Sequence, residues 1–247
     1  MARNIGPKII NDGLIYCFDA GDTNCYPGTG TVCKNLAVPF ISGDFLGGTS
    51  FSSENGGCIV TDGVDDYVNT NIGYNPGTTG NLTIENWTFP TGPFPYVTSL
   101  RIAGFIGANA IQSPGYGNYI VTETGAPEIP TTIRISSQWR NNVSNVTFLN
   151  PDQFFPMNVW YHIIASYNRT TSVAMLYING ILIHSTNTNP ISGTNSNVTE
   201  PIVLSTASLV TNMHCGGKTA IGRIYNRALT STEMLQNFNA VRGRFGI

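Results

Sequence analysis

Charged residues are scarce in this sequence. Lys and Arg number 12 and Asp and Glu number 14, so 11% of the 247 residues are charged and the formal net charge is -2. Nucleic acids and anionic membranes are bound by clustered Lys and Arg, and the sequence has no such cluster. We therefore expect neither a nucleic acid nor a membrane among the partners of this protein.

Long apolar runs are also missing. The start of the chain, MARNIGPKIINDG, lacks the apolar core of about 7 to 15 residues that a signal peptide requires. No stretch approaches the ~18 apolar residues of a membrane-spanning helix. The sequence predicts a protein that is made in the cytoplasm and is not secreted.

Metal-binding and redox motifs are absent as well. The five cysteines form no C-x-x-C pair, and the three histidines are scattered, apart from His214 beside Cys215. Structural zinc needs closely spaced Cys or His ligands, so we expect no zinc site and no cofactor. Thiols stay reduced in the cytoplasm, which predicts five core or free thiols, with a Cys25–Cys33 bridge formed after release as the alternative.

No catalytic motif can be found. Retaining glycosidases need two carboxyl groups about 5 Å apart, and the sequence contains no Glu-x-Asp-x-x-Glu or similar pattern. Glu85 is alone on its predicted strand, and Glu233 has a predicted role in capping a helix. A Gly-x-Ser-x-Gly elbow and a phosphate-binding loop are also missing. The prediction is a protein that is not an enzyme.

What the sequence does contain is typical of an all-β fold. Residues are 41% hydrophobic, with 27 Gly and 14 Pro, a balance that suits short strands joined by turns. Residues 160–167 are apolar on nearly both faces, as in a central strand. Residues 173–178 and 181–184 flank Asn179-Gly180, the preferred hairpin turn, because both residues tolerate positive φ.

The chain ends in a predicted helix. Thr230 and Glu233 form a T-x-x-E capping box, and the apolar residues that follow share one helical face: Met234, Leu235, Phe238 and Val241. We find no linker and no repeat, so residues 1–247 are predicted to form one domain. Within it, Trp87, Trp160 and Tyr177 are expected between two facing sheets.

A loop-rich region covers about residues 88–157, where eight of the 14 prolines fall. Stiff loops suit a contact surface because less entropy is lost on binding, although they also suit connections over the rim. Sugars bind to aromatic faces flanked by amides. The candidate glycan-binding or partner-binding residues here are Tyr96, Tyr116, Asn118, Tyr119 and Trp139, unless Trp139 belongs to the core and the tyrosines cover strand ends.

Several segments, in order along the chain, resemble the laminin-G-like (concanavalin A-like lectin/glucanase) domains of bacteriophage virion proteins, particularly those of cyanophages. They are residues 13–21, 62–68 (DGVDDYV), 82–87, 160–167, 176–180 (LYING) and 224–229 (IYNRAL), together with the ending 242–247 (RGRFGI). The resemblance implies a jelly-roll sandwich of two antiparallel sheets with one short C-terminal helix.

The same resemblance implies a function and a location. The protein is expected in the virion, as a structural protein that decorates the capsid or tail through contacts with other virion proteins, and as a homo-oligomer. Arg242 and Arg244, with Arg223 and Arg227, would face acidic partner surfaces, or else be solvated. The alternative is an adhesin that binds a host surface glycan, and a second alternative is a glycoside hydrolase.

Related folds carry calcium in rim loops. Residues 205–219 contain no Asp or Glu, and calcium needs about 6 to 8 oxygen ligands, so that metal site is not expected here. Asp62, Asp65 and Asp66 offer another place for an ion. The favoured role of these aspartates is to bind the backbone of the turn around Gly63.

Overall fold

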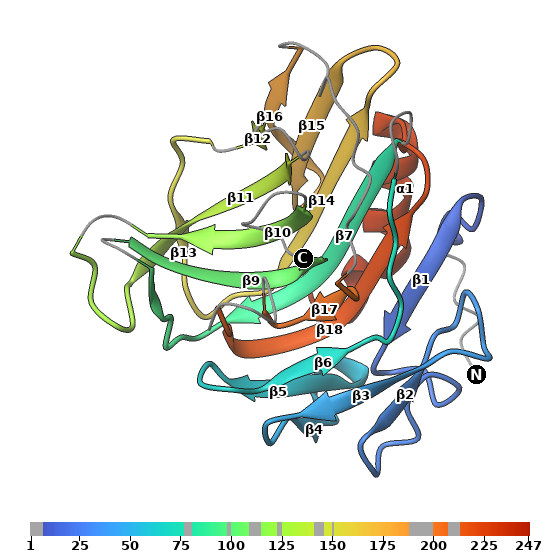
Figure 1. Ribbon diagram of the computed structural model, residues 1–247, viewed down its shortest axis with the longest axis vertical. Helices are drawn as coiled ribbons and strands as arrows, with labels where there is room; N and C mark the ends of the chain where they lie inside the picture. The colour runs from blue at the N-terminus through green and yellow to red at the C-terminus, as the bar shows by residue number, and fades with distance from the viewer. Residues whose placement is uncertain are drawn as a thin grey trace.

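The structure is a computed structural model, and it describes residues 7–76, 81–97, 100–108, 115–122, 125–140, 146–149, 151–187, 200–206 and 213–247. Two antiparallel sheets face each other (Figure 1). Sheet A runs in the order β16 (Ile181–Thr186), β15 (Val173–Ile178), β14 (Tyr161–Asn168), β7 (Leu82–Pro90), β18 (Gly216–Tyr225), β5 (Cys58–Asp62) and β4 (Ser50–Ser52), with β1 (Leu14–Asp19) beside β18.

Sheet B lies opposite. It runs in the order β12 (Val146–Leu149), β11 (Thr132–Arg140), β10 (Gly115–Val121), β9 (Leu100–Ala108), β17 (Val203–Leu204), β6 (Tyr67–Asn69), β3 (Ser42–Leu46) and β2 (Val32–Lys34), with β13 (Phe155–Pro156) beside β11 and β8 (Tyr96–Val97) beside β9. The predicted all-β sandwich of two antiparallel sheets is confirmed.

The main hydrophobic core fills the space between the sheets. Sheet A contributes Ile84 of β7 and Ile163 of β14, and sheet B contributes Ile120 of β10 and Ile135 of β11, all fully buried. Side chains alternate along a strand, so the residues two positions away continue the same inner face. Removal of this apolar surface from water is the main force that holds the two sheets together.

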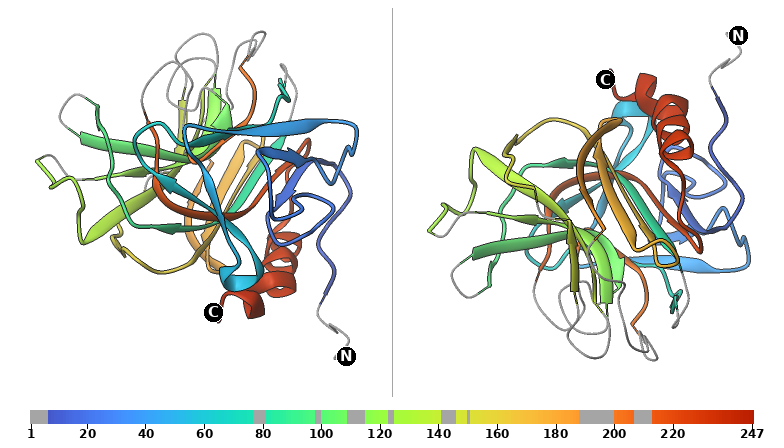
Figure 2. Two further views of the ribbon diagram at one scale, coloured as in Figure 1. Left: turned by 90° about the horizontal axis from the view of Figure 1, so that it is seen from below. Right: turned by 90° about the horizontal axis from the view of Figure 1, so that it is seen from above.

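A second apolar layer covers the outer face of sheet A. The helix α1 (Ser231–Val241) and a 3₁₀ turn at Arg242–Arg244 lie against this face, as all three views show (Figures 1 and 2). Trp87 of β7 stacks on Phe238 and Phe245, with ring centroids 5.9 Å and 4.3 Å away.

The outer layer corrects the prediction for three aromatic residues. Trp87 and Trp160 belong to the cluster under the helix, and Tyr177 packs against a neighbouring cluster on the same outer face. The expectation that all three lie between the sheets was wrong. Strand β7 is buried on both faces, so its alternation could not tell which face meets sheet B.

The predicted hairpin and capping box are both confirmed. Asn179 and Gly180 have φ of 49° and 76° between β15 and β16. The Thr230 side chain accepts a hydrogen bond from the backbone N–H of Glu233, and the Glu233 side chain accepts one from that of Thr230. The apolar face differs in one position, since Leu235 is exposed and Asn237 is fully buried.

All five cysteines are buried free thiols, as predicted from the reducing conditions of the cytoplasm. The alternative Cys25–Cys33 bridge is not present. Burial raises the pKa of Cys33 to about 11, and it raises the pKa of Cys25 and Cys215 further. Thiols with a raised pKa hold little of the reactive thiolate at neutral pH. In the described part of the chain, no helix has the length and apolar character to cross a membrane.

Candidate ligand-binding surface

Three of the predicted site residues point into the core. Tyr116, Asn118 and Trp139 are fully buried. In the pairing of β10 with β11, Tyr116 lies opposite Trp139, and Asn118 lies opposite the buried Ser137. The Asn118 amide donates a hydrogen bond of 2.9 Å to Asn86 Oδ1 on the facing sheet. A ligand outside the protein cannot reach these side chains, so the glycan-site prediction was wrong for them. The alternative reading of Trp139 as a core residue is confirmed.

Tyr119 is also buried, but on the other face of sheet B. It lies opposite Ser136, and its hydroxyl is 3.3 Å from Gln138 Oε1. Only 4% of Tyr119 is exposed, so direct contact of this ring with a ligand is not supported either. Tyr96 lies in β8, and its side chain is outside the described part of the structure.

The outward-facing side chains of β11 form a polar row. The row consists of Thr132, Arg134, Ser136, Gln138 and Arg140. Ser136 and Gln138 in its middle are buried, whereas Thr132 at one end is exposed and the two arginines are half-buried. Access from solvent to the described row is therefore greatest at its Thr132 end.

An exposed aromatic ring stands at that end of the row. Strand β13 pairs with β11 so that Phe155 lies opposite Ile133, and both of these side chains are buried. Because neighbouring side chains of a strand point to opposite faces, Phe154 is turned outward beside Arg134. The residue is 39% exposed, and the Arg134 guanidinium carbon lies 4.9 Å from the centroid of its ring.

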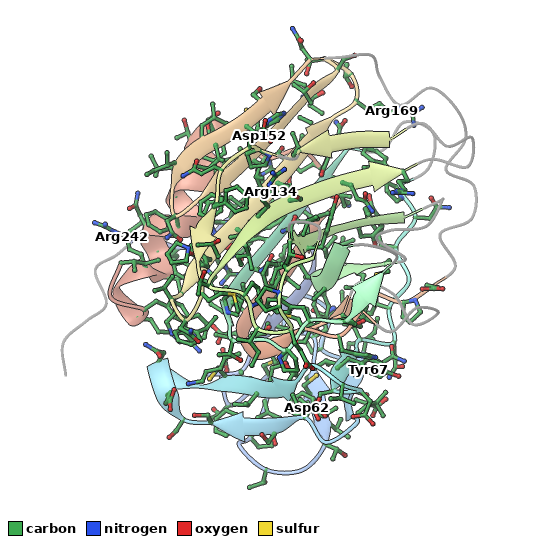
Figure 3. All side chains as sticks on the ribbon, turned by 90° about the vertical axis from the view of Figure 1, so that its left-hand side faces the viewer. Asp62, Tyr67, Arg134, Asp152, Arg169 and Arg242 are labelled. Carbon is green, nitrogen blue, oxygen red and sulfur yellow. The ribbon has the colours of Figure 1, made fainter. Side chains whose placement is uncertain are left out.

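The ring borders a cavity of about 340 Å³. The cavity is lined by Gly125, Ala126, Pro127, Pro130, Thr131, Thr132 and Phe154. Asp152 completes the surface: one of its carboxylate oxygens is 3.3 Å from Arg134 Nη1, and Figure 3 shows Arg134 and Asp152 close together on this face. We call Phe154, Arg134, Asp152 and this cavity the Phe154 surface.

The Phe154 surface lies inside the predicted loop-rich region, but sequence reasoning missed its residues. The segment PDQFFP (residues 151–156) contains two adjacent phenylalanines, and alternation requires one of them to face away from the core. The sequence had no signal for which of the two that is. The register of β13 against β11 decides it.

The aspartates around Gly63 bind their own turn. Asp66 Oδ2 accepts a hydrogen bond of 2.9 Å from the Asp62 backbone N–H, and Asp62 Oδ1 accepts one of 2.8 Å from Val64. Oxygens of Asp62, Asp65 and Asp66 lie within 4.8 Å of one another. Burial, together with the neighbouring carboxylates, raises the pKa of Asp66. The predicted turn-binding role is confirmed for Asp62 and Asp66.

Glu85, the carboxylate on a central strand, is shut away from solvent. Its side chain is fully buried, with Arg223 Nη1 at 2.6 Å, His162 Nε2 at 3.2 Å and the Asn237 amide at 2.7 Å. Burial raises the pKa of Glu85, but Arg223 and then His162 outweigh it and leave the pKa at about 2. These contacts join β7, β14, β18 and α1, and they leave Glu85 without access to a substrate.

Most of the C-terminal arginines are used within the chain. Arg244 pairs with Asp19 at 2.6 Å and also donates to the backbone carbonyls of Asn55 and Gly57. Arg223 is buried against Glu85, and Arg227 pairs with Glu233. Arg244 is thus engaged within the chain, and a contact between it and a partner stays a prediction. Arg242 is exposed at the end of α1, where Figure 3 shows it at the edge of the molecule, and its role in partner binding stays a prediction.

A family comparison agrees with this architecture. The model described as concanavalin A-like lectin/glucanases superfamily matches residues 62–234, which is more than half of the chain. The chain belongs to this superfamily. The matched range holds β11, β13 and the whole Phe154 surface. No curated protein matches the sequence.

Solved structures that are similar to this chain include toxin binding domains. The binding domain of Paraclostridial Mosquitocidal Protein 1 has a TM-score of 0.66 at 16% identity, with 93% of this chain and 52% of that chain covered. A structure of botulinum neurotoxin type C, whose cell entry depends on interaction with two ganglioside molecules, has a TM-score of 0.62 at 13% identity, with 94% and 52% covered. This chain spans about half the length of those structures.

A third similar structure is covered almost completely. Domain 4 of AbnA, a GH43 extracellular arabinanase from Geobacillus stearothermophilus, was solved in complex with arabinotriose. Its TM-score is 0.57 at 14% identity, with 92% of this chain and 98% of that chain covered. At such identities the likeness demonstrates a shared fold.

Proposed function

We propose that this protein is a non-catalytic carbohydrate-binding module, and that the Phe154 surface is its saccharide site. The observation that carries the proposal is the exposed Phe154 ring, which lines a cavity and lies beside an arginine that pairs with a carboxylate. A sugar ring has apolar faces that pack on an aromatic side chain and hydroxyl groups that need polar partners. The Phe154 surface offers both.

Two further observations support binding without catalysis. The buried Glu85 is held by two basic side chains and one amide, and hydrolysis would need a reachable pair of carboxyl groups. Among the similar structures, the AbnA domain was solved with arabinotriose and the type C toxin interacts with gangliosides. The ligands of these two similar structures favour a sugar ligand for this chain.

Replacing Phe154 with Ala should weaken saccharide binding by roughly 3- to 10-fold, because full burial of a phenyl ring contributes about 1.5–3 kcal/mol and 39% of Phe154 is still exposed for a ligand to cover. A glycan array identifies the ligand of the wild-type protein, and isothermal titration calorimetry then measures both affinities. The matched control is Phe40→Ala, which removes a ring that is 99% exposed and lies in the turn between β2 and β3, away from this surface.

Two results would count against the proposal. Absence of binding by the folded wild-type protein to every glycan on the array would remove the carbohydrate-binding function. Binding that survives unchanged in Phe154→Ala would place the saccharide site elsewhere on the molecule.

The resemblance to virion domains supports a more specific proposal, in which this module sits on the surface of a phage particle. In the favoured arrangement, the module is a homo-oligomer that decorates the capsid or tail through contacts with other virion proteins. In the alternative, it is an adhesin on a fibre. We expect mass spectrometry to detect the protein in purified particles and immunogold labelling to locate it. Particles that lack the protein would contradict this assignment.

A further inference from the structure

We infer that the saccharide recognised by the Phe154 surface is acidic, with a carboxylate that binds Arg134. This inference rests on the proposed function and adds the chemical class of the ligand. It follows from three features of the surface: the weak contact between Asp152 and Arg134, the Arg134 Nε donor without an acceptor among the described residues, and the aromatic ring beside the guanidinium.

The pair between Arg134 and Asp152 is easily exchanged. One Nη1–Oδ1 contact of 3.3 Å joins the two residues, and the Asp152 side chain is 97% exposed while that of Arg134 is 28% exposed. A single contact with so exposed a carboxylate contributes little to stability. A ligand carboxylate that meets the guanidinium through two parallel hydrogen bonds would make a stronger pair and displace Asp152 into water.

The guanidinium of Arg134 has a donor that its neighbours do not use. Arg134 Nε is buried and has no hydrogen-bond acceptor among the described residues. Buried donors are rarely left unpaired, and an acceptor from water, an ion or a bound molecule is expected to complete them. A carboxylate, which only accepts hydrogen bonds, is the sugar substituent that best complements such a surface.

The Phe154 surface places its cation beside its aromatic ring. Arg134 is the positive side chain of this surface, and Asp152 is the negative one that a ligand carboxylate would replace. The Phe154 ring fixes the position of the guanidinium, because Arg134 lies over it at 4.9 Å. The ring and the guanidinium can thus contact the sugar face and the carboxylate of the same residue.

The test compares acidic saccharides with their neutral partners by calorimetry. Sialyllactose is measured against lactose, and digalacturonic acid against galactobiose, so that a sialic acid and a uronic acid are distinguished. We expect the acidic member of at least one pair to bind about tenfold more tightly than its neutral partner, and this preference to fall with added salt. Equal affinities within both pairs would overturn the inference while leaving a carbohydrate-binding function in place.

Two substitutions should change the preference in opposite directions. Arg134→Gln should bring the ratio of acidic to neutral affinity close to one, whereas Asp152→Asn should raise the affinity for the acidic sugar several-fold, because it removes the competing carboxylate. Asp152 is almost fully exposed, so its variant is expected to fold normally.

Charge-matched controls lie on other surfaces. Arg242→Gln and Asp44→Asn each remove one charge from an exposed or half-buried side chain outside the Phe154 surface, and both should leave the ratio unchanged. A ratio that is unaffected by Arg134→Gln, or an acidic affinity that falls in Asp152→Asn, would contradict the role of this pair. Failure of the wild-type protein to bind any saccharide would instead reject the carbohydrate-binding function itself.

Discussion

Replacing Glu85 with Gln is expected to destabilise the protein by about 3–5 kcal/mol, the usual cost when one partner of a buried ion pair is removed. The substitution leaves Arg223 almost completely buried, with no neutralising carboxylate 2.6 Å away. Arg223 lies directly across from Glu85 in the pairing of β18 with β7, so the lost interaction is at the centre of sheet A. Chemical denaturation of the wild type and the variant measures the difference in free energy of unfolding.

An exposed pair of the same kind is the control. Glu54 pairs with Lys218, and its side chain is 61% exposed. Glu54→Gln should cost less than about 1 kcal/mol, because water screens such pairs. Equal effects of the two substitutions would mean that burial of the Glu85 network does not matter for stability.

The same network predicts a loss of stability in acid. The pKa of Glu85 is held at about 2 in the folded protein, below the ordinary value of 4.5. A depressed folded pKa contributes stability that is fully present above the unfolded value and is lost as the pH falls from about 4.5 through about 2. Thermal unfolding between these pH values should therefore shift less in Glu85→Gln than in the wild type, and parallel curves would contradict the assignment.

Replacing Trp87 with Ala is expected to cost about 3–5 kcal/mol as well, because removal of a large buried side chain leaves a cavity. Trp87 is fully buried and packs on both the helix and the C-terminal segment. Its ring centroid is 5.9 Å from that of Phe238 and 4.3 Å from that of Phe245. The loss should therefore also loosen α1 on sheet A. Denaturation measures the first effect, and hydrogen exchange of the α1 amides measures the second.

Phe40→Ala is the control for this experiment too. The ring is 99% exposed, so its removal should change stability by no more than about 0.5 kcal/mol. A Trp87→Ala variant with nearly wild-type stability would show that the helix and sheet A do not depend on this contact.

Local features were predicted well because neighbouring residues are enough to specify them. The Asn179-Gly180 turn needs two residues that tolerate positive φ, and the Thr230–Glu233 capping box needs two side chains at a fixed spacing. The bounds of β15 also agree with the prediction, since its flanking turns are strong signals. Strands β2, β3 and β4 in the N-terminal segment were not identified, because they are short and have weak alternation.

The Phe154 surface lies in the loop-rich region that the sequence indicated, but it consists of other residues than the predicted ones. Tyr116, Asn118 and Trp139 are residue types that often bind sugars, and the sequence alone could not show that they fill the core. Arg244 was expected at a partner surface, yet Asp19, 225 positions away in the chain, holds it. Contacts between residues so distant in sequence have no local signal.

The sequence by itself determined the all-β class, the hairpin, the capped helix and the lack of a catalytic carboxylate motif, because each depends on residue types at short spacing. The tertiary structure alone decided which face of each strand is inner. Helix α1 covers the outer face of sheet A, so β7 is apolar on both sides, and Trp87 could have faced either way. The register of β13 against β11 likewise decided that Phe155 fills the core and Phe154 meets solvent.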